Sequence, residues 1–471
     1  MSHGLPTRAA SVFQHRRRAL AATLIGTPGL LFSGVSRARN YAANVFGFRP
    51  DSHFLYTVGA WLEGAALLID RGEDTLFLPM PDPSDVIWHG ESPSWADIQA
   101  ATGVDWVRPI DELGTVLSEL GRTKIATLPA IDPTTRFRQG SLLDRAWALP
   151  GSKVELGALD LRFADAMIGL RLIHDEAALE LMRGASEATV AAHRAGMAAT
   201  RPGRHESDVR AAMEAELTRR DMGCSYGSIV TVHGEILHAH GYANPLRSGD
   251  LLLADVGAEH EGWAGDVTRT WPVSGKFSPT QTTMYELVLA MQLAAIDRVR
   301  AGARYRDIHL AAARVLAQGL VDEGIFKGDV DNLVERGATG LFFPHGLGHL
   351  LGLDVHDMED LGDRAGYAPG RERSQQFGLC YLRLDRDLAP GMAVTIEPGF
   401  YQIPAVMAPG ADRIAPFEAD GTLDRARLRQ FRDVRGIRIE DDVLVTEDAP
   451  EVLTGALGKT VAEIEAMVGA G

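Results

Sequence analysis

Two aspartates at the facing ends of two neighbouring apolar segments place the strongest constraint on this sequence. The segment DLLLADVGAEHEGWAGDVTRTWPV (250–273) predicts two strands joined by a turn near 259–262, with Asp255 ending the first strand and Asp266 opening the second. Strand pairing would bring the two carboxylates side by side. Two buried carboxylates repel each other, so the pair needs a cation or a shared proton. A solvated hairpin tip is the alternative, and the apolar flanks argue against it.

A histidine-rich segment further along the chain offers nitrogen ligands. HGLGHLLGLDVHD (345–357) holds His345, His349 and His356, three of the 15 histidines in 471 residues. Three glycines argue against a regular helix here, since each costs roughly 1 kcal/mol relative to alanine. The pattern therefore indicates backbone that approaches something closely. Taken alone, it is equally consistent with a loop carrying scattered core histidines, because a histidine pair specifies no metal.

Two more carboxylates follow apolar strands near the end of the chain. Glu397 ends the apolar run of AVTIEPGFY (393–401), and in RGIRIEDDVLV (435–445) Arg438 and Glu440 alternate with isoleucines on one predicted strand. Charged residues that alternate in a strand usually face solvent. Neither stretch alone therefore indicates a site.

Together these segments supply a set of four carboxylates and one imidazole: Asp255, Asp266, His349, Glu397 and Glu440. Mostly hard oxygen ligands with one nitrogen suit Mn²⁺, Co²⁺ or Zn²⁺, and a bridging carboxylate suits two ions roughly 3.5–4 Å apart. Four carboxylates also balance the charge of two divalent ions. The set predicts a dinuclear metal site.

The five segments, in this order, resemble the metal-ligand motifs of the pita-bread metallopeptidases, and most closely those of the branch that contains aminopeptidase P and prolidase. RNYAANVFGFRPDSHFLYTVGAWLEGAALLID (39–70) is similar to the amino-terminal domain of the same enzymes. The resemblance covers nearly the whole chain. It implies an α+β pita-bread catalytic domain over 171–471, preceded by an α/β, creatinase-like domain over 1–170. It also implies hydrolysis of the bond between an N-terminal residue and a following proline.

The resemblance further implies roles for the ligands. Asp255 and Asp266 would hold one divalent ion, and Asp266, His349, Glu397 and Glu440 would hold the other, with Asp266 and Glu440 bridging. The two ions, expected to be Mn²⁺ with Co²⁺ or Zn²⁺ as alternatives, would activate a water as the nucleophile. Glu397 would carry its proton to the leaving proline nitrogen.

Other residues match family positions that contact the substrate. His238 in EILHAHG and His356 would be catalytic, since they would hydrogen-bond the scissile peptide and stabilise its oxyanion. His345 would shape the proline side of the pocket, and Tyr226 is expected to bind substrate.

Arg383 leaves the length of the substrate open. It lies fourteen residues before Glu397, where prolidases carry a carboxylate-binding arginine, and Arg438 matches a second such position. A guanidinium there could hold the C-terminus of an Xaa-Pro dipeptide. Alternatively, Arg383 pairs with an acidic neighbour such as Asp385 or Asp387 on a mobile insertion. We expect an Xaa-Pro aminopeptidase, with an Xaa-Pro dipeptidase as the alternative.

Three other interpretations fit the sequence less well. Gly223–Gly227 (GCSYG) matches the G-x-S-x-G nucleophile elbow, which must follow a strand, whereas here it follows a predicted helix. Non-peptidase pita-bread proteins and creatine hydrolases lack the five ligands. Methionine aminopeptidases share them but lack a comparable amino-terminal domain.

The chain departs from the common aminopeptidase P pattern in two places. The loop between Tyr226 and His238 is shorter, which leaves the shape of that pocket wall open. The stretch FGLCYLRLDRDLAPG (377–391) resembles prolidase instead.

Helical periodicity and strand patterns alternate after residue 174. Helices are predicted over about 175–197, through Val209–Leu217, from the Ser278 capping box with Pro279 at its first position, and over about 305–323. Residues 358–387 and 403–432 are polar and irregular, and are expected to be insertions.

Composition and hydropathy argue against nucleic-acid binding, membrane insertion and export. Lys plus Arg is 47 against 63 for Asp plus Glu, a net charge of −16, which argues against nucleic-acid binding. No apolar run approaches 18 residues, so no membrane span is expected. The basic Arg16–Arg18 followed by apolar residues imitates a signal peptide, but 26–29 (GTPG) breaks the run, and we predict a helix end followed by a strand.

Two cysteines fit a reducing compartment, so a cytoplasmic protein is expected. The expected partners are proline-containing peptides. The resemblance also implies a homodimer or homotetramer, because the amino-terminal domain can overhang a neighbour's active site.

Overall fold

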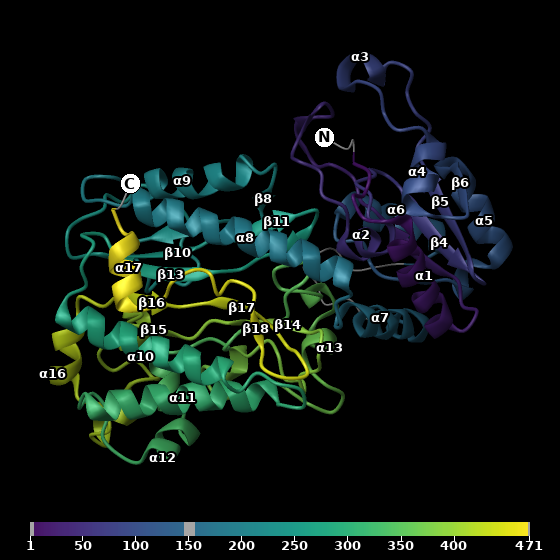
Figure 1. Cartoon of the computed structure of the whole chain (residues 1–471). Coiled ribbons are helices and arrows are strands. Elements are labelled where there is room, and N and C mark those ends of the chain that lie inside the picture. Colours follow the sequence, from purple (N-terminus) through teal and green to yellow (C-terminus); the bar gives the residue numbers. More distant parts are fainter. Residues whose placement is uncertain (1–3, 146–155, 470–471) are drawn as a thin grey trace. The chain divides into compact units, whose positions relative to one another are not determined.

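The structure is a computed structural model that describes residues 4–145 and 156–469. The chain divides into two compact units, Met1–Arg171 and Leu172–Gly471, each with a hydrophobic core of its own (Figure 1). Within the described ranges, none of the helices combines the length and the apolar character needed to cross a bilayer.

A five-stranded mixed sheet organises the amino-terminal unit, with strand order β6-β5-β4-β1-β7. The three inner strands are antiparallel, and the two edge strands pair in parallel with their neighbours. The strands are β1 Gly29–Phe32, β4 Ala66–Asp70, β5 Glu73–Leu78, β6 Trp106–Pro109 and β7 Ala126–Thr127, with a separate hairpin of β2 Ala38–Tyr41 and β3 Asn44–Val45.

Buried residues of this sheet pack on the helix that follows β6. Leu30, Phe77 and Leu68 belong to one cluster with Leu113 and Leu117 of α5. The helices of the unit are α1 Ala10–Leu24, α2 Ser52–Val58, α3 Asp85–His89, α4 Trp95–Thr102, α5 Leu113–Leu120, α6 Pro133–Leu143 and α7 Ala158–Arg171.

The helix end and first strand predicted after the arginine run are confirmed, as α1 and β1. Arg17 is fully buried, and its Nε lies 2.6 Å from Asp74 Oδ2. Its terminal nitrogens donate to the carbonyl oxygens of Thr57, Thr102 and Gly103. The basic run therefore ties α1 to the sheet and to the end of α4.

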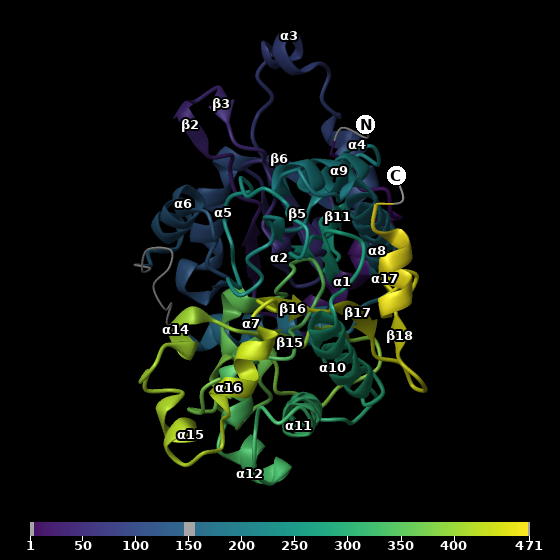
Figure 2. The ribbon, with the colours of Figure 1, turned by 90° about the vertical axis from the view of Figure 1, so that its left-hand side faces the viewer.

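In the carboxy-terminal unit, short strands lie between two helix pairs, α8–α9 and α10–α11 (Figures 1 and 2). The pairs are α8 Glu176–Ala199 with α9 Glu206–Thr218, and α10 Pro279–Ile296 with α11 Tyr305–Asp322. All four predicted helices are thus confirmed. The Ser278 hydroxyl caps α10 by accepting from the Gln281 N–H, and the Gln281 side chain accepts from the Ser278 N–H in return.

The strands of this unit form several small antiparallel sheets, in the orders β13-β10-β9, β12-β11-β8, β14-β17-β18 and β15-β16. Their bounds are β8 Gly223–Cys224, β9 Ile229–Thr231, β10 Leu251–Asp255, β11 Ala258–His260, β12 Trp263–Ala264, β13 Thr268–Pro272, β14 Ala393–Ile396, β15 Gly399–Tyr401, β16 Gly436–Arg438, β17 Asp441–Leu444 and β18 Glu451–Val452.

The predicted hairpin with two aspartates is present, but its second strand is interrupted. β12 pairs with β11, whereas β13 pairs with β10, so the chain changes partner between them. Asp266 lies in this break rather than at the start of a strand, and Thr268 is the residue opposite Asp255. The prediction that Asp266 opens a strand is therefore wrong by two residues.

The single strand predicted over 435–445 is also wrong, because it is two strands. β16 pairs with β15 and β17 pairs with β14, with Ile439 and Glu440 between them. The opposite chain breaks at the same level, at Glu397 and Pro398. A proline has no N–H to continue a ladder, so the two-stranded ribbon bends here and presents both glutamates at the bend.

The segments expected to be insertions are irregular. Residues 358–387 and 403–432 form turns and helices of five residues or fewer: α13 Asp363–Gly366, α14 Pro404–Met407, α15 Ala415–Ala419 and α16 Arg425–Leu428. The remaining helices are α12 Val330–Glu335 and α17 Val461–Met467.

Candidate active site

All eleven residues predicted to form the site line one cavity of about 680 Å³ in the carboxy-terminal unit. They are Tyr226, His238, Asp255, Asp266, His345, His349, His356, Arg383, Glu397, Arg438 and Glu440. Much of the remaining wall is apolar or aromatic and includes Ile229, Leu237, Phe377, Tyr381, Ile403 and Val406. Polar chemistry is thus concentrated in one part of a largely apolar pocket.

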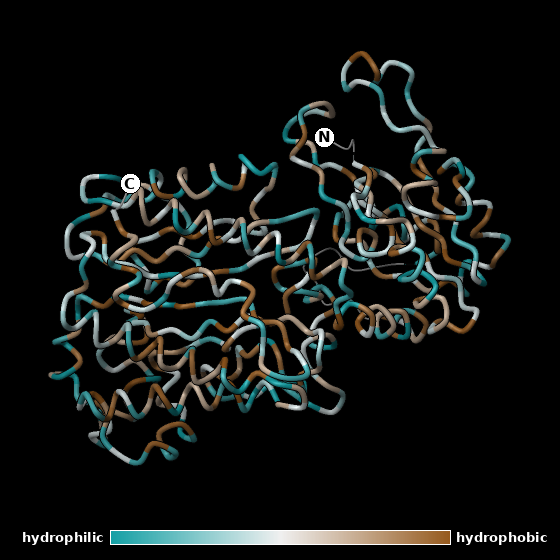
Figure 3. The backbone as a smooth tube through the Cα atoms, viewed as in Figure 1, coloured by the Kyte–Doolittle hydropathy of each residue, from teal (hydrophilic) through white to brown (hydrophobic). Residues whose placement is uncertain are grey.

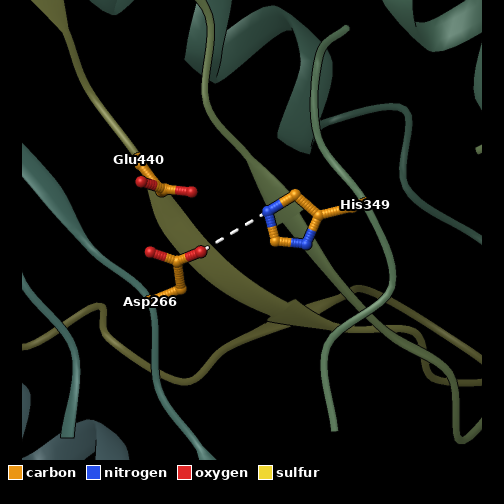
Figure 4. Close-up of side chains that lie close together, drawn as sticks. All are labelled: Asp266, His349 and Glu440. Atoms are coloured by element: carbon orange, nitrogen blue, oxygen red, sulfur yellow. Dashed lines mark ion pairs between the residues drawn. The ribbon is translucent and has the colours of Figure 1, made fainter. Parts of the chain in front are cut away.

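Asp266, His349 and Glu440 point toward one another, and each offers a ligand atom within 4.8 Å of the other two (Figure 4). His349 Nε2 lies 3.4 Å from Asp266 Oδ2 and 3.4 Å from Glu397 Oε1. These separations suit ligands that share one ion at about 2.0–2.2 Å from each. Three of the five predicted metal ligands therefore lie around one point, and Glu397 lies next to His349.

Backbone contacts place His349 beside Glu397. The Leu347 oxygen accepts from the Glu397 N–H, and the His349 oxygen accepts from the Thr395 N–H, so the histidine segment runs along β14. At Gly348, a Cβ atom would lie 2.2 Å from the Thr395 oxygen. The close approach predicted from the glycines is confirmed here, and the neighbour is the strand that directly precedes Glu397.

The hydrogen bonds of His349 fit a metal ligand. Its Nδ1 lies 3.0 Å from the Leu350 carbonyl oxygen, which can only accept, so Nδ1 carries the proton. Nε2 then presents a lone pair to the oxygens of Asp266 and Glu397. Electron-rich atoms facing one another at this distance need a cation or a proton between them, and a backbone carbonyl behind the ring is a usual partner of a metal-bound histidine.

The pKa values of three carboxyl groups in the cavity are raised, which is the direction expected where acids are gathered around a cation site. Burial, followed by the charge of Asp255, raises the pKa of Asp266 to about 8. Burial also raises the pKa of Glu397, and it raises that of Glu440 well above its ordinary value, with Asp266 as the next cause. Bringing these groups together as anions is costly unless positive charge joins them.

Tyr226 joins the two aspartates. Its hydroxyl lies 2.5 Å from Asp255 Oδ1 and 2.6 Å from Asp266 Oδ1. One hydroxyl has one proton and can satisfy only one of these oxygens. The second contact is a further indication that the centre binds a cation or a proton. The predicted substrate-binding role of Tyr226 stays a prediction.

Arg438 supplies a buried positive charge next to the carboxylates. Its Nη2 lies 2.5 Å from Asp255 Oδ2, its Nε donates to the Thr268 hydroxyl, and its Nη1 donates to the Tyr401 hydroxyl. The Thr268 hydroxyl in turn donates to Glu440 at 2.7 Å. Arg438 and Glu440 are both buried, so the solvent-facing alternative for this strand is wrong. Whether Arg438 contacts substrate stays a prediction.

The other predicted histidines lie around the carboxylates. His345 Nε2 lies 2.9 Å from the Tyr401 hydroxyl, and burial, then Arg438, lowers the pKa of His345 to about 3. The ring of His356 meets that of His349 edge-on at 4.3 Å. Burial, then Arg438, lowers the pKa of His238. His238 and His345 are therefore neutral near pH 7 and can each donate one N–H.

Arg383 is at the cavity wall, but neither aspartate considered from the sequence is its partner. Asp385 binds Arg304 in a bidentate pair at 2.6 Å, and Asp387 binds Arg371 at 2.8 Å. Arg383 Nη1 instead lies 2.5 Å from Glu359 Oε2. The sequence offered no signal for this pair, because its members are far apart in the chain.

Sequence reasoning also missed the buried polar residues that contact the backbone of the predicted ligands Asp266 and Glu440. The Asp266 N–H donates to Asp442 Oδ2 at 3.1 Å, and Arg269 donates to the Glu440 carbonyl oxygen. Arg269 pairs with Asp441, and both side chains are fully buried. Two further acids directly after Glu440 were a signal that could have been used.

The G-x-S-x-G match does not form a nucleophile elbow. Gly223–Cys224 is a two-residue strand, and strand β9 follows without a helix in between. The Ser225 hydroxyl donates to the Gly265 carbonyl oxygen at 2.8 Å. This serine therefore supports the loop that carries Asp266.

Two models of known protein families match this chain. The model of "Metallopeptidase family M24" matches residues 180–447, more than half of the chain, and that of "Aminopeptidase P, N-terminal domain" matches residues 13–127. The chain belongs to metallopeptidase family M24. The predicted fold class is thereby confirmed: an M24 pita-bread domain preceded by an aminopeptidase P amino-terminal domain.

Several M24 proteins are similar along nearly the whole chain. The Xaa-Pro aminopeptidase of Haemophilus influenzae is 34% identical over 96% of both chains. The Xaa-Pro dipeptidase of Homo sapiens is 32% identical over 89% of this chain and 84% of its own. The solved structure of Pseudomonas aeruginosa aminopeptidase PepP superposes with a TM-score of 0.80 at 31% identity, covering 98% of each chain.

Proposed function

We propose that this M24 protein hydrolyses the peptide bond between an N-terminal residue and a following proline. The observation that carries the proposal is one cavity in which Asp255, Asp266, His349, Glu397 and Glu440 converge beside an apolar wall. The relatives that bear the names Xaa-Pro aminopeptidase and Xaa-Pro dipeptidase support this bond specificity.

Two divalent cations, with Mn²⁺ expected, are proposed to be held by the five ligands. Asp255 and Asp266 would hold one, and Asp266, His349, Glu397 and Glu440 the other. Oxygen-rich donors with one imidazole favour Mn²⁺, with Co²⁺ or Zn²⁺ as alternatives. When bound, such ions supply Lewis acidity and a water acidified enough to react at neutral pH. The lone pair of His349 and the raised pKa values of Asp266, Glu397 and Glu440 support this fit.

The protein's own groups would move the proton and hold the substrate. Glu397, whose pKa is raised by burial, can accept a proton and return it to the leaving proline nitrogen. His238 and His356 would donate to the scissile carbonyl and to the oxyanion that forms there. His345, packed edge-on against Phe343, would bound the proline side.

We favour an aminopeptidase over a dipeptidase. A dipeptidase would need Arg383 to bind the free carboxylate of proline, and that guanidinium already pairs with Glu359 at 2.5 Å. The alternative, an Xaa-Pro dipeptidase restricted through Arg383, is supported by the prolidase-like stretch at 377–391 and by the human dipeptidase relative.

The decisive experiment measures metal and cleavage together. Metal-loaded protein should release Xaa from Xaa-Pro-Yaa-Zaa and leave Xaa-Ala-Yaa-Zaa intact, with close to two metal ions per chain by mass spectrometry. Protein that binds no stoichiometric Mn, Co or Zn and cleaves neither peptide would be a non-peptidase binding relative. Release of Xaa from both peptides would refute the proline specificity.

We also propose a homodimer or homotetramer. Helix α3 carries Val86, Ile87 and Trp88, which are 50%, 75% and 77% exposed, and Figure 3 shows hydrophobic colouring at this helix. Adjacent exposed apolar residues favour burial against a second copy of the chain. Light scattering should give a mass of at least about 102 kDa, twice 50.9 kDa. A monomer would refute this.

A cytoplasmic location and a domain boundary between residues 170 and 171 complete the proposal. Free Cys224 and Cys380, both partly exposed, support a reducing compartment. The division of the chain at Arg171 supports the boundary. Separate production of residues 1–170 and 171–471 would test it, since each fragment should unfold in one cooperative transition of its own.

A further inference from the structure

Glu359 lies between two residues of the cavity wall. Its Oε2 is 2.5 Å from Arg383 Nη1 and 3.5 Å from His356 Nδ1. Arg383 and His356 line the cavity, and Glu359 approaches them from the insertion behind it. One carboxylate oxygen thus faces both the guanidinium and the imidazole.

The backbone is arranged to hold Glu359 in this place. The preceding residue, Met358, has φ of +58°, a left-handed conformation that is uncommon for a residue other than glycine. The Met358 side chain is 1% exposed, so its packing fixes the turn. A short 3-10 helix, Glu359–Leu361, follows at once. Buried packing therefore maintains a costly backbone conformation next to the acid.

The other acids near Arg383 on the insertion pair with other arginines, so Arg383 pairs with Glu359. Asp385 is taken by Arg304, and Asp387 is taken by Arg371. Among the described residues, Glu359 is the acid within ion-pair distance of Arg383. Although burial opposes it, contact with His356 and Arg383 lowers the pKa of Glu359 to about 2, so the group is anionic throughout the neutral range.

A carboxylate on Arg383 is chemically equivalent to the C-terminus of a dipeptide. We propose that Glu359 occupies the position on Arg383 that the free carboxylate of an Xaa-Pro dipeptide would take, and so selects for longer peptides. The inference rests on the proposed Xaa-Pro cleavage and names the substrate class. A dipeptide must displace an anion and remain close to it, whereas a longer peptide presents a neutral amide at the same position.

The size of the effect follows from exposure. The side chains of Arg383 and Glu359 are 36% and 37% exposed, so solvent screens the pair. Pairs of this kind contribute up to about 1 kcal/mol, so the expected change in selectivity is about threefold to fivefold.

The test compares Ala-Pro with Ala-Pro-NH₂, which differ in the terminal carboxylate. The measured quantity is the ratio of kcat/KM for the acid to kcat/KM for the amide. Glu359→Gln should raise this ratio about threefold to fivefold. The ratio cancels any effect on His356 that is common to both substrates. Glu359→Ala should give the same direction without an amide side chain.

A double-mutant cycle tests whether Glu359 changes the ratio through Arg383. Arg383→Gln should lower the ratio much more in the Glu359→Gln background than in the wild type, because only there is the guanidinium free. Asp363→Asn is the matched control: Asp363 pairs with Arg373 on the same insertion at 2.6 Å, and its loss should leave the ratio unchanged.

A ratio within twofold of wild type in both Glu359 variants would overturn the inference, as would a rise that persists in Glu359→Gln/Arg383→Gln. Wild-type protein that cleaves neither these substrates nor Ala-Pro-Yaa-Zaa would instead refute the proposed function. The two failures are therefore distinguishable.

Discussion

Replacing Arg269 by methionine is expected to destabilise the carboxy-terminal unit by about 4 kcal/mol. Arg269 is fully buried on β13, and its Nη2 lies 2.7 Å from Asp441 Oδ1. Its guanidinium also donates to four backbone carbonyl oxygens, those of Thr268, Glu440, Leu457 and Gly458. Methionine keeps a similar length but has no donor.

The magnitude follows from what each partner loses. Five hydrogen bonds at about 1 kcal/mol each set a scale of about 5 kcal/mol. Asp441 is not left alone, since Lys459 Nζ lies 2.8 Å and Gln292 Nε2 lies 2.9 Å from its Oδ2. Those partners and the apolar contacts of methionine reduce the loss to about 4 kcal/mol, close to the cost of breaking a buried ion pair.

Urea unfolding followed by circular dichroism measures this loss. The measurement is made in chelator, so that metal binding adds nothing to either protein's stability. Arg183→Met is the control, because Arg183 pairs with Glu451 at 3.0 Å on the surface and its loss should cost less than about 1 kcal/mol. A loss below about 1 kcal/mol in Arg269→Met as well would refute the reasoning.

Further outcomes are expected. Asp266→Asn and Glu440→Gln should each lower bound metal and reduce activity by about a thousandfold or more; full metal and turnover in both would contradict the ligand set. Burial lowers the pKa of His309 to about 4, against about 6.5 unfolded, so the unfolded chain takes up the proton first as pH falls. Stability should drop by up to about 3 kcal/mol between pH 6.5 and 4, and His309→Gln should flatten that drop in urea titrations. Xaa-Pro-Yaa-Zaa should be cleaved at least as well as Xaa-Pro; a strong dipeptide preference that disappears in Arg383→Ala would favour the dipeptidase.

Local signals in the sequence located the acids that line the cavity, whereas their predicted role as metal ligands came from the family resemblance. Asp255 ends strand β10 and Glu397 directly follows strand β14, so in both places the end of an apolar run located an acid at a strand end. The capping box at Ser278 likewise fixed the start of α10, because its two hydrogen bonds involve residues three apart.

Features that depend on pairing partners could not be derived in the same way. The break between β16 and β17 arises because the strand changes neighbour, and the alternation of residues within 435–445 does not reveal which neighbour each part has. The partner of Arg383 was sought among its sequence neighbours, whereas Glu359 is 24 residues away. Charged residues that alternate with apolar ones in a strand usually face solvent. Arg438 is instead buried along with Ile437 and Ile439 on either side of it.

The bent ribbon has a consequence for how such a protein can change over evolutionary time. Glu397 and Glu440 owe their positions to strand register, so a one-residue insertion in either strand would rotate one of these carboxylates away from the cavity. Phe377, Arg383 and Val406 reach the same cavity from long irregular segments that contain none of the predicted metal ligands. Evolution can therefore change the length or the charge of these irregular segments, and with them the peptide preference. The residues that cluster at the bend stay unchanged.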